Sequence, residues 1–442
     1  MRQMFDFTIS ELGPCKVVPP ILLSKLSKRA GDFITNYIRN DEFIIYDLAA
    51  APGDNVTLTD KHLLEKAGPK ELIFFNPEEV HAGIVTCGGL CPGLNDVIRA
   101  VVMALWYEYG VSRISGVPFG YRGFLPEFNH DLIPLKPDVV KDIHRMGGTY
   151  LGSSRGYGEY TSQIVDSMEK HGINMLFTIG GDGTQRGSLR IAEEVERRGL
   201  NAAVVGIPKT IDNDLSFIEK SFGFETAVSE AANAVNGAHV EASCAVNGIG
   251  LVKVMGRESG FIAAYTALGT RDVNFVLVPE VPFDLDGENG LLANLQRRLE
   301  RRGHAVIVVA EGAGQEHLEA VSTECDPSGN KKLGDIGLFL QDRIRSYFKE
   351  IKTEVNVRYI DPSYMIRATV ANPIDSTYCA RLGTYAVHAA MAGKTKMLVS
   401  HVNDAYVHIP TELAISERNR IKPESELWRD VIEATGQPSL MK

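Results

Sequence analysis

Apolar and polar positions follow a regular alternation along most of the chain. From about residue 82 onward, short apolar runs of five to eight residues are each followed by a longer segment. The longer segments carry apolar residues three or four positions apart, which is typical of a helix with one buried face. In the first of them these are Leu94, Ile98, Val102, Leu105 and Tyr109. The alternation predicts an α/β fold with largely parallel sheets covered on both faces.

The pattern places the elements as follows. Strands are expected at 82–86, 113–117, 175–179, 202–207, 250–255, 275–280 and 305–312. Helices are expected at 94–110, 185–200, 259–269, 290–303, 335–350 and 375–392. Residues 1–78 lack this rhythm and are broken by Pro and Asp, so we expect an irregular extension that packs on the core or serves assembly. Residues 401–442 are expected to be a polar tail with one short helix near 425–434.

Composition narrows the class of protein. The 442 residues suggest about two or three domains. A formal net charge of -10 argues against a broad nucleic-acid surface. The start of the chain does not resemble a signal peptide, and no apolar run approaches the roughly 18 residues that span a bilayer. Six scattered cysteines predict free thiols and a cytoplasmic location, although Cys87 and Cys91 are close enough to form a redox couple.

Polar loops follow the expected strands, and in parallel α/β proteins ligands bind at such strand ends. The loop 86–95 has the glycines of a phosphate-binding turn. Leu94 and Asn95 stand where a P-loop needs Lys and Ser/Thr, so the P-loop interpretation fails. In loop 147–156, Arg155 is either a solvated surface charge or a bidentate phosphate ligand.

Two further loops carry carboxylates. In "IGGDGT" (179–184), Asp182 suits Mg²⁺ beside phosphates, and it equally suits the cap of the following helix. In "GIPKTIDNDL" (206–215), Asp212 can accept a proton from a hydroxyl, and Lys209 and Thr210 can stabilise a transferring phosphoryl group. Asp214 can assist through the metal. The alternative is an exposed loop held by Asx turns.

The second half of the chain adds anion-binding candidates. Arg257 follows the strand 250–255, and Glu311 ends the strand 305–312, where a carboxylate can hold sugar hydroxyls. Two arginines and a tyrosine in "VRYIDPSYMIRA" suit a phosphate monoester. They are Arg358, Tyr364 and Arg367.

Seven of these motifs, in this order, resemble the phosphofructokinase family: "GGLCPGLN", "GGTYLGSSRG", "GGDGT", "PKTIDND", "MGRESG", "AEGAG" and "YIDPSYMIRA". The resemblance covers about residues 80–395. It implies two doubly wound lobes with an active-site cleft, and phosphoryl transfer to the primary hydroxyl of fructose 6-phosphate. The expected domains are an extension 1–78, a nucleotide-binding lobe 79–223 with 366–416, and a sugar-phosphate lobe 224–365 with 417–442.

The resemblance also implies roles for individual residues. The nucleotide positions are Gly89, Arg155, Gly156, Gly181, Asp182, Gly183 and Thr184, with Mg²⁺ on Asp182 and Asp214. Asp212 matches the catalytic base, with Lys209, Thr210 and Arg257 as further catalytic residues. The sugar-phosphate positions are Thr210, Ile211, Asp212, Met255, Gly256, Arg257, Glu311, Arg358, Tyr364 and Arg367.

Two residues bear on the phosphoryl donor. Pyrophosphate users of the family have a second Asp where Gly183 stands, so Gly183 leaves room for ATP. Lys209 resembles the pyrophosphate group, whereas typical bacterial ATP enzymes have Gly there. Because the steric room at Gly183 outweighs the lysine, we expect ATP as the phosphoryl donor and a place in the long ATP-dependent branch of the family. The resemblance also implies a homodimer or homotetramer. The alternatives are a pyrophosphate-dependent enzyme, a kinase for a lipid or NAD, and a catalytically silent regulatory subunit.

Overall fold

The computed structural model describes residues 5–25, 33–47, 59–318 and 332–442, which divide into two compact units. The chain passes between the units several times, and one crossing separates Thr210 from Ile211 within the loop 206–215. Unit 1 comprises Met1–Thr210, Leu215–Phe222 and Thr369–Arg418. Unit 2 comprises Ile211–Asp214, Gly223–Ala368 and Asn419–Lys442.

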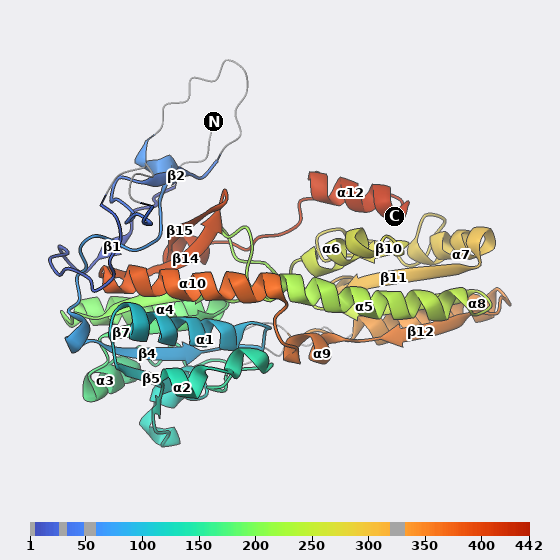
Figure 1. Ribbon diagram of the computed structural model, residues 1–442. Helices are drawn as coiled ribbons and strands as arrows, with labels where there is room; N and C mark the ends of the chain where they lie inside the picture. Colours follow the sequence, from blue (N-terminus) through green and yellow to red (C-terminus); the bar gives the residue numbers. More distant parts are fainter. Residues whose placement is uncertain (1–4, 26–32, 48–58, 319–331) are drawn as a thin grey trace, which may run out of the picture. The chain divides into compact units, whose positions relative to one another are not determined.

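Unit 1 is built on a seven-stranded sheet (Figure 1). The inner strands pair in parallel, and β6 and β15 are antiparallel edge strands. The spatial order is β15 (Ala405–Pro410), β14 (Met397–Val402), β8 (Ala203–Pro208), β7 (Met175–Gly180), β4 (His81–Thr86), β5 (Arg113–Val117) and β6 (Ile133–Pro134). From β4 the chain moves to β5 on one side and then returns to β7 on the other. Such a reversal creates a ligand-binding crevice at the carboxyl ends of the strands.

Helices cover the sheet of unit 1. The apolar stripes of α3 (Thr161–His171) and α4 (Asp182–Arg197) bury Ile164 and Ile191 against Val85 and Leu176 of the sheet. Another pair, α1 (Leu94–Met103) and α10 (Pro373–Met391), packs so closely that a Cβ at Gly383 would lie 2.7 Å from the Cβ of Ala100. A π-helical turn, η3 (Ala104–Glu108), extends α1.

Unit 2 has a smaller, wholly parallel sheet with a continuous apolar core. Its spatial order is β10 (Phe275–Leu277), β11 (His304–Ala310), β9 (Gly248–Val254) and β12 (Asn356–Ile360). The main helices are α5 (Phe224–Ser243), α6 (Phe261–Thr270), α7 (Leu291–Arg302), α8 (Ile336–Glu350) and the short α9 (Ser363–Ala368). The α/β class with largely parallel sheets is therefore confirmed.

Several segments differ from the sequence-based expectation, among them α3 and β12, which were not predicted. The long helix α5 was not predicted, because its buried stripe consists mainly of alanines such as Ala231 and Ala238. The description of residues 401–442 as a polar tail is wrong for its first part, since β14 and β15 form a hairpin. Asn403 and Asp404 turn this hairpin with φ angles of 48° and 60°, which their short polar side chains tolerate. The expected helix near the end is α12 (Glu426–Thr435).

The described part of the amino-terminal extension is irregular and packs on unit 1. Its strand β1 (Ser10–Glu11) pairs with β13 (Lys394–Thr395), and β2 (Phe43–Ile45) forms a hairpin with β3 (Leu63–Glu65). The buried ammonium of Lys394 contacts Glu11, and its Nζ lies 2.8 Å from Oε2 of Glu65. These ion pairs anchor the extension to the core.

Other expectations concern cysteines and membranes. The described free thiols are those of Cys15, Cys87, Cys91, Cys244 and Cys379. Cys325 lies outside the described residues. Burial raises the pKa of Cys87 to about 12, which is unfavourable for a reactive thiolate. In the described ranges, no helix has both the length and the apolar character that crossing a membrane requires.

Candidate active site

Lys209 joins three strand ends in unit 1. It follows β8, and its backbone N–H donates to the carbonyl of Gly180 at the end of β7, at 3.0 Å. Its buried side chain extends to the glycine loop after β4, where Nζ donates to the carbonyl of Gly89 at 2.9 Å. Because the three strands are parallel, these ends lie at one edge of the sheet. The lysine therefore fixes the two glycine-containing loops relative to each other.

The loop 147–156 closes on the same glycines. Gly88 has a left-handed φ of 87°, and its N–H donates to the carbonyl of Ser154 at 2.9 Å. The hydroxyl of Ser153 donates to the carbonyl of Gly88 at 2.6 Å. Arg155 and Gly156 follow directly, and Nη2 of Arg155 lies 3.7 Å from the position of a Cβ on Gly89. The structure thus brings Gly89, Arg155 and Lys209 together.

Asp182 begins α4 directly after β7 and Gly181. Its Oδ2 lies 3.2 Å from Nε of Arg186 and 3.9 Å from Nη2 of Arg418. Neither arginine was predicted: Arg186 is hidden in the helical pattern, and Arg418 lies in the stretch described as a tail. The carbonyl of Thr184 accepts a hydrogen bond from Tyr121 at 2.8 Å.

Gly183 occupies the second position of α4 and is exposed. A Cβ placed on it meets no described heavy atom within 4 Å, and its backbone is ordinary right-handed helix. Neither packing nor backbone geometry in the described chain therefore requires glycine here. Gly183 therefore faces open space.

In unit 2, Asp212 lies in an acidic environment. Burial, together with the negative charges of Asp214 and Glu311, raises the pKa of Asp212 to about 7. The positive charge of Arg367 and a backbone hydrogen bond from Arg257 act in the opposite direction. Asp212 is therefore a carboxylate that can take up and release a proton near neutral pH, as a general base requires.

The loops after β9 and β11 form the surroundings of Asp212. Met255, Gly256 and Arg257 follow β9, and the hydroxyl of Ser259 donates to the carbonyl of Asp212 at 3.1 Å. The N–H of Glu311 donates to the carbonyl of Val254 at 2.9 Å, and the N–H of Gly312 to that of Gly256 at 3.0 Å. Ser259 was part of a recognised motif but was not singled out from the sequence.

The remaining predicted residues are only partly brought together. Arg367 is close enough to Asp212 for its charge to lower the pKa of that carboxyl. Tyr364 lies on the same helix, α9, and is 83% exposed. Arg358 lies within β12 instead of at its end, and its Nε is 3.5 Å from Oε2 of Glu241 in α5.

The two residues before Asp212 are held by the protein itself. Buried Ile211 precedes Asp212, and the carbonyl of Thr210 accepts a hydrogen bond from Ser221 in unit 1.

Comparison with known proteins identifies the family. The family model described as phosphofructokinase matches residues 81–390, which is most of the chain. The chain belongs to the phosphofructokinase family. The ATP-dependent 6-phosphofructokinase of Borreliella burgdorferi is 55% identical over 447 residues, covering 100% of this chain and 99% of the relative. That of Amycolatopsis methanolica is 43% identical, covering 98% and 95%.

The phosphofructokinase fold is also found among solved structures. The pyrophosphate-dependent phosphofructokinase from Marinobacter aquaeolei matches with a TM-score of 0.66 over 80% of this chain and 91% of that chain. Its sequence identity is 20%, so this likeness concerns the fold alone. It agrees with the doubly wound architecture of the two units.

Phosphofructokinases act on charged phosphates, which raises the question of a metal. Among the described residues, no group of three or more His, Cys, Asp or Glu side chains could hold a metal ion. Mg²⁺ is commonly held by one or two carboxylates and completed by substrate phosphates and water. Asp182, beside the open space at Gly183, fits that kind of site.

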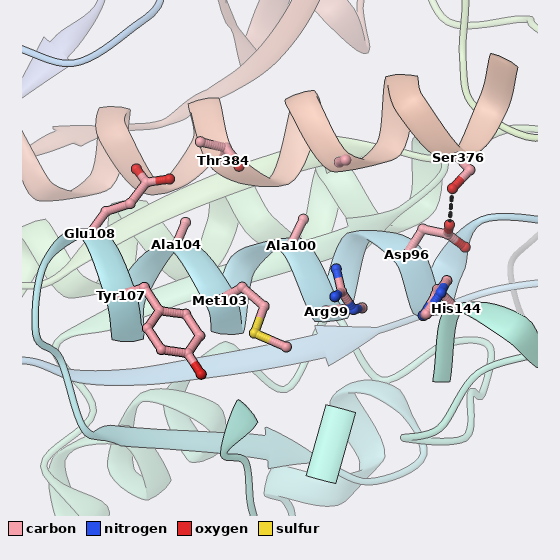
Figure 2. A pocket seen from close by; sticks show the side chains of 11 residues that line it. Asp96, Arg99, Ala100, Met103, Ala104, Tyr107, Glu108, His144, Ser376 and Thr384 are labelled. Carbon is pink, nitrogen blue, oxygen red and sulfur yellow. Dashed lines mark hydrogen bonds between the residues drawn. The ribbon is translucent and has the colours of Figure 1, made fainter. Parts of the chain in front are cut away.

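A separate cavity of about 280 Å³ lies between α1 and α10 (Figure 2). Its walls include Arg99, His144 and Asp96, and Ser376 donates to Asp96 at 2.6 Å. Its lining residues are different from those predicted for the active site.

Proposed function

We propose that this protein is an ATP-dependent 6-phosphofructokinase, which converts fructose 6-phosphate to fructose 1,6-bisphosphate in glycolysis. The environment of Asp212 is the observation on which this proposal chiefly rests. Its pKa near 7 suits a base that removes the proton of a sugar hydroxyl. The names of the two relatives that align with nearly the whole chain support the same reaction.

In the proposed reaction, the primary hydroxyl oxygen attacks the γ-phosphorus of ATP. The bond from that phosphorus to the bridging oxygen breaks, ADP leaves, and the hydroxyl proton passes to Asp212. Phosphoryl transfer needs mainly positioning and charge stabilisation from the protein. We assign the stabilisation of the transferring group to Lys209, Thr210 and Arg257.

Binding roles are assigned residue by residue. Asp182 and Asp214 would hold Mg²⁺, which neutralises phosphate charge when bound with the nucleotide. The proposed nucleotide ligands are Gly89, Arg155, Gly156, Gly181, Gly183 and Thr184. Ile211, Met255, Gly256, Glu311, Arg358, Tyr364 and Arg367 are proposed to contact the sugar phosphate.

The open space at Gly183 supports ATP as the donor. An Asp there would place a negative charge where the inner phosphates of a nucleotide must lie. Lys209 is compatible with ATP, because an additional cation can also stabilise a phosphoryl group that is transferred from ATP. A homodimer or homotetramer in the cytoplasm remains our expectation, and light scattering of the purified protein measures the subunit number.

The decisive experiment supplies the purified protein with fructose 6-phosphate, Mg²⁺ and either ATP or pyrophosphate. We expect the bisphosphate from ATP and a rate with pyrophosphate close to background. Asp212→Asn serves as the control for contaminating kinases. Product from pyrophosphate alone would overturn the donor assignment, and product from neither donor would favour a regulatory subunit.

A further inference from the structure

Lys253 is a charged residue in an inner strand of the unit 2 sheet. Its side chain in β9 is only 12% exposed, and its Nζ lies 2.9 Å from Oδ2 of Asp361 and 3.1 Å from Oδ2 of Asp335. Removing an ammonium from water is costly, and an apolar residue would fill a strand position with less penalty. The stability of the strand therefore does not explain this lysine.

The two carboxylates that receive Lys253 each begin a helix. Oδ1 of Asp335 accepts the N–H of Gly337 at 3.0 Å at the start of α8. Oδ1 of Asp361 accepts the N–H of Ser363 at 3.1 Å and its hydroxyl at 2.5 Å at the start of α9. In both cases the lysine binds one oxygen and leaves the other for the helix. One ammonium thus connects β9 to two helix starts.

The helix α9 depends on this connection more than α8 does. It contains only six residues, which is too short for a helix to be stable by itself. It carries Tyr364, whose ring is largely exposed, and Arg367, whose charge reaches Asp212. Buried Ile366 holds one face of α9, and the start of the helix helps to set the placement of both side chains.

We propose that Lys253 is a positioning residue for the sugar-phosphate site: through Asp361 it fixes the place at which α9 presents Tyr364 and Arg367 to a phosphate monoester. This inference rests on the proposed function, because the ligand is the phosphate group of fructose 6-phosphate. Lys253 itself binds carboxylates and does not contact the substrate.

The test removes the charge of Lys253 and keeps its length. Titration calorimetry with fructose 6-phosphate, and steady-state kinetics, compare wild type with Lys253→Met. We expect the dissociation constant and KM for the sugar phosphate to rise about tenfold, while the KM for ATP changes by less than about twofold. Lys253→Arg, which keeps the charge, restores part of the affinity.

The two partners of Lys253 provide a matched pair of variants. Asp361→Asn is expected to reproduce the loss of sugar-phosphate affinity, and it also serves if Lys253→Met does not fold. Asp335→Asn weakens the start of α8 and is expected to lower Tm with little change in that affinity. A role limited to stability would make the two variants alike in affinity.

The binding measurements distinguish the positioning role of Lys253 from the proposed function of the protein. If wild type binds fructose 6-phosphate and Lys253→Met and Asp361→Asn bind it equally well, the positioning role is overturned alone. Equal losses for Asp335→Asn and Asp361→Asn overturn it as well. A wild-type protein that binds no fructose 6-phosphate overturns the proposed function, and the inference with it.

Discussion

Gly183 in unit 1 and Gly312 in unit 2 both follow a buried parallel strand, yet their surroundings differ. A Cβ on Gly183 meets no described heavy atom within 4 Å. A Cβ on Gly312 would lie 1.8 Å from the carbonyl oxygen of Arg257, well inside van der Waals contact. The first glycine leaves space beside the chain, and the second allows two loops of the chain to touch. Similar strand-end sequences therefore face open space in one unit and make close internal contacts in the other.

The two strand-end carboxylates, Asp182 and Asp212, also differ in the charges that surround them. In unit 1 the carboxylate of Asp182 lies beside the positive charges of Arg186 and Arg418. In unit 2 the negative charges of Asp214 and Glu311 favour the protonated form of Asp212. A carboxylate that titrates near neutrality, as Asp212 does, suits proton transfer.

The largest expected effect comes from removing Asp212, the proposed proton acceptor in unit 2. Asp212→Asn should lower kcat by about 10³–10⁴-fold, because the amide cannot accept the hydroxyl proton. The affinity for ATP, measured by calorimetry, should be nearly unchanged. Substantial residual turnover would remove Asp212 from the role of base.

The same variant has a second readout, in stability. The raised pKa means that folded protein retains a proton that unfolded protein loses between about pH 4 and pH 7, so stability falls as pH rises through this window. At pH 8, Asp212→Asn should therefore be more stable than wild type, by about 1–3 kcal/mol after allowance for solvent screening. Loss of activity with loss of stability would contradict this account.

The next largest effect is expected at Gly312. Gly312→Ala forces the loops after β9 and β11 apart, so the free energy of unfolding should fall by about 2–4 kcal/mol. Thermal or denaturant unfolding measures the change. Gly183→Ala is the matched control, and it should leave stability unchanged or raise it by up to about 1 kcal/mol, because Ala favours a helix. Equal losses at both positions would abolish the distinction between the two glycines.

A charge introduced at Gly183 tests whether the phosphates of ATP lie beside this residue. Gly183→Asp should fold normally, since the space is open, and should raise the KM for ATP about tenfold or more through repulsion of the phosphates. The KM for fructose 6-phosphate should change little. Unchanged ATP affinity in this variant would refute the steric and electrostatic argument for ATP.

The smallest perturbation is a change of pH in the wild-type enzyme. Because Asp212 must be ionised to accept a proton, and its pKa in the free protein is about 7, kcat/KM for fructose 6-phosphate should fall as pH falls through 7. Between pH 8 and pH 6 the decrease should be about tenfold. A kcat/KM that stays constant down to pH 5 would show that Asp212 titrates at its ordinary value.

Strands and their following loops were the part of the fold most accessible from sequence. Buried parallel strands such as β7 and β8 are continuous apolar runs, and each ends in a polar loop that stands out beside them. The helix α5 was not recognised because its contacts are made by small side chains, which give little amphipathic contrast. The β14–β15 hairpin was missed because Ser400, His401 and His408 interrupt its two short apolar runs, although most positions of both strands are buried.

The residues of the candidate site could likewise be predicted only where a single loop carries them. Motifs on single loops named Asp182, Asp212 and Arg257, but no spacing along the sequence indicates Arg418, which lies more than 200 residues after the carboxylate it approaches. Tertiary pairing of this kind depends on how distant loops meet. Gly183 and Lys209, the residues that bear on the choice of phosphoryl donor, were picked out from the sequence. The open surroundings of Gly183 are visible only in the coordinates.

The ion pairs of Lys394 have a practical consequence for anyone who shortens this chain. Its side chain is 9% exposed, and the described counter-ions come from Glu11 and Glu65, both amino-terminal to residues 81–390, which match the family model. A version trimmed to start near residue 79 would lack both counter-ions of Lys394 and the strand that pairs with β13. Such a fragment should accumulate in inclusion bodies even though every catalytic loop is intact.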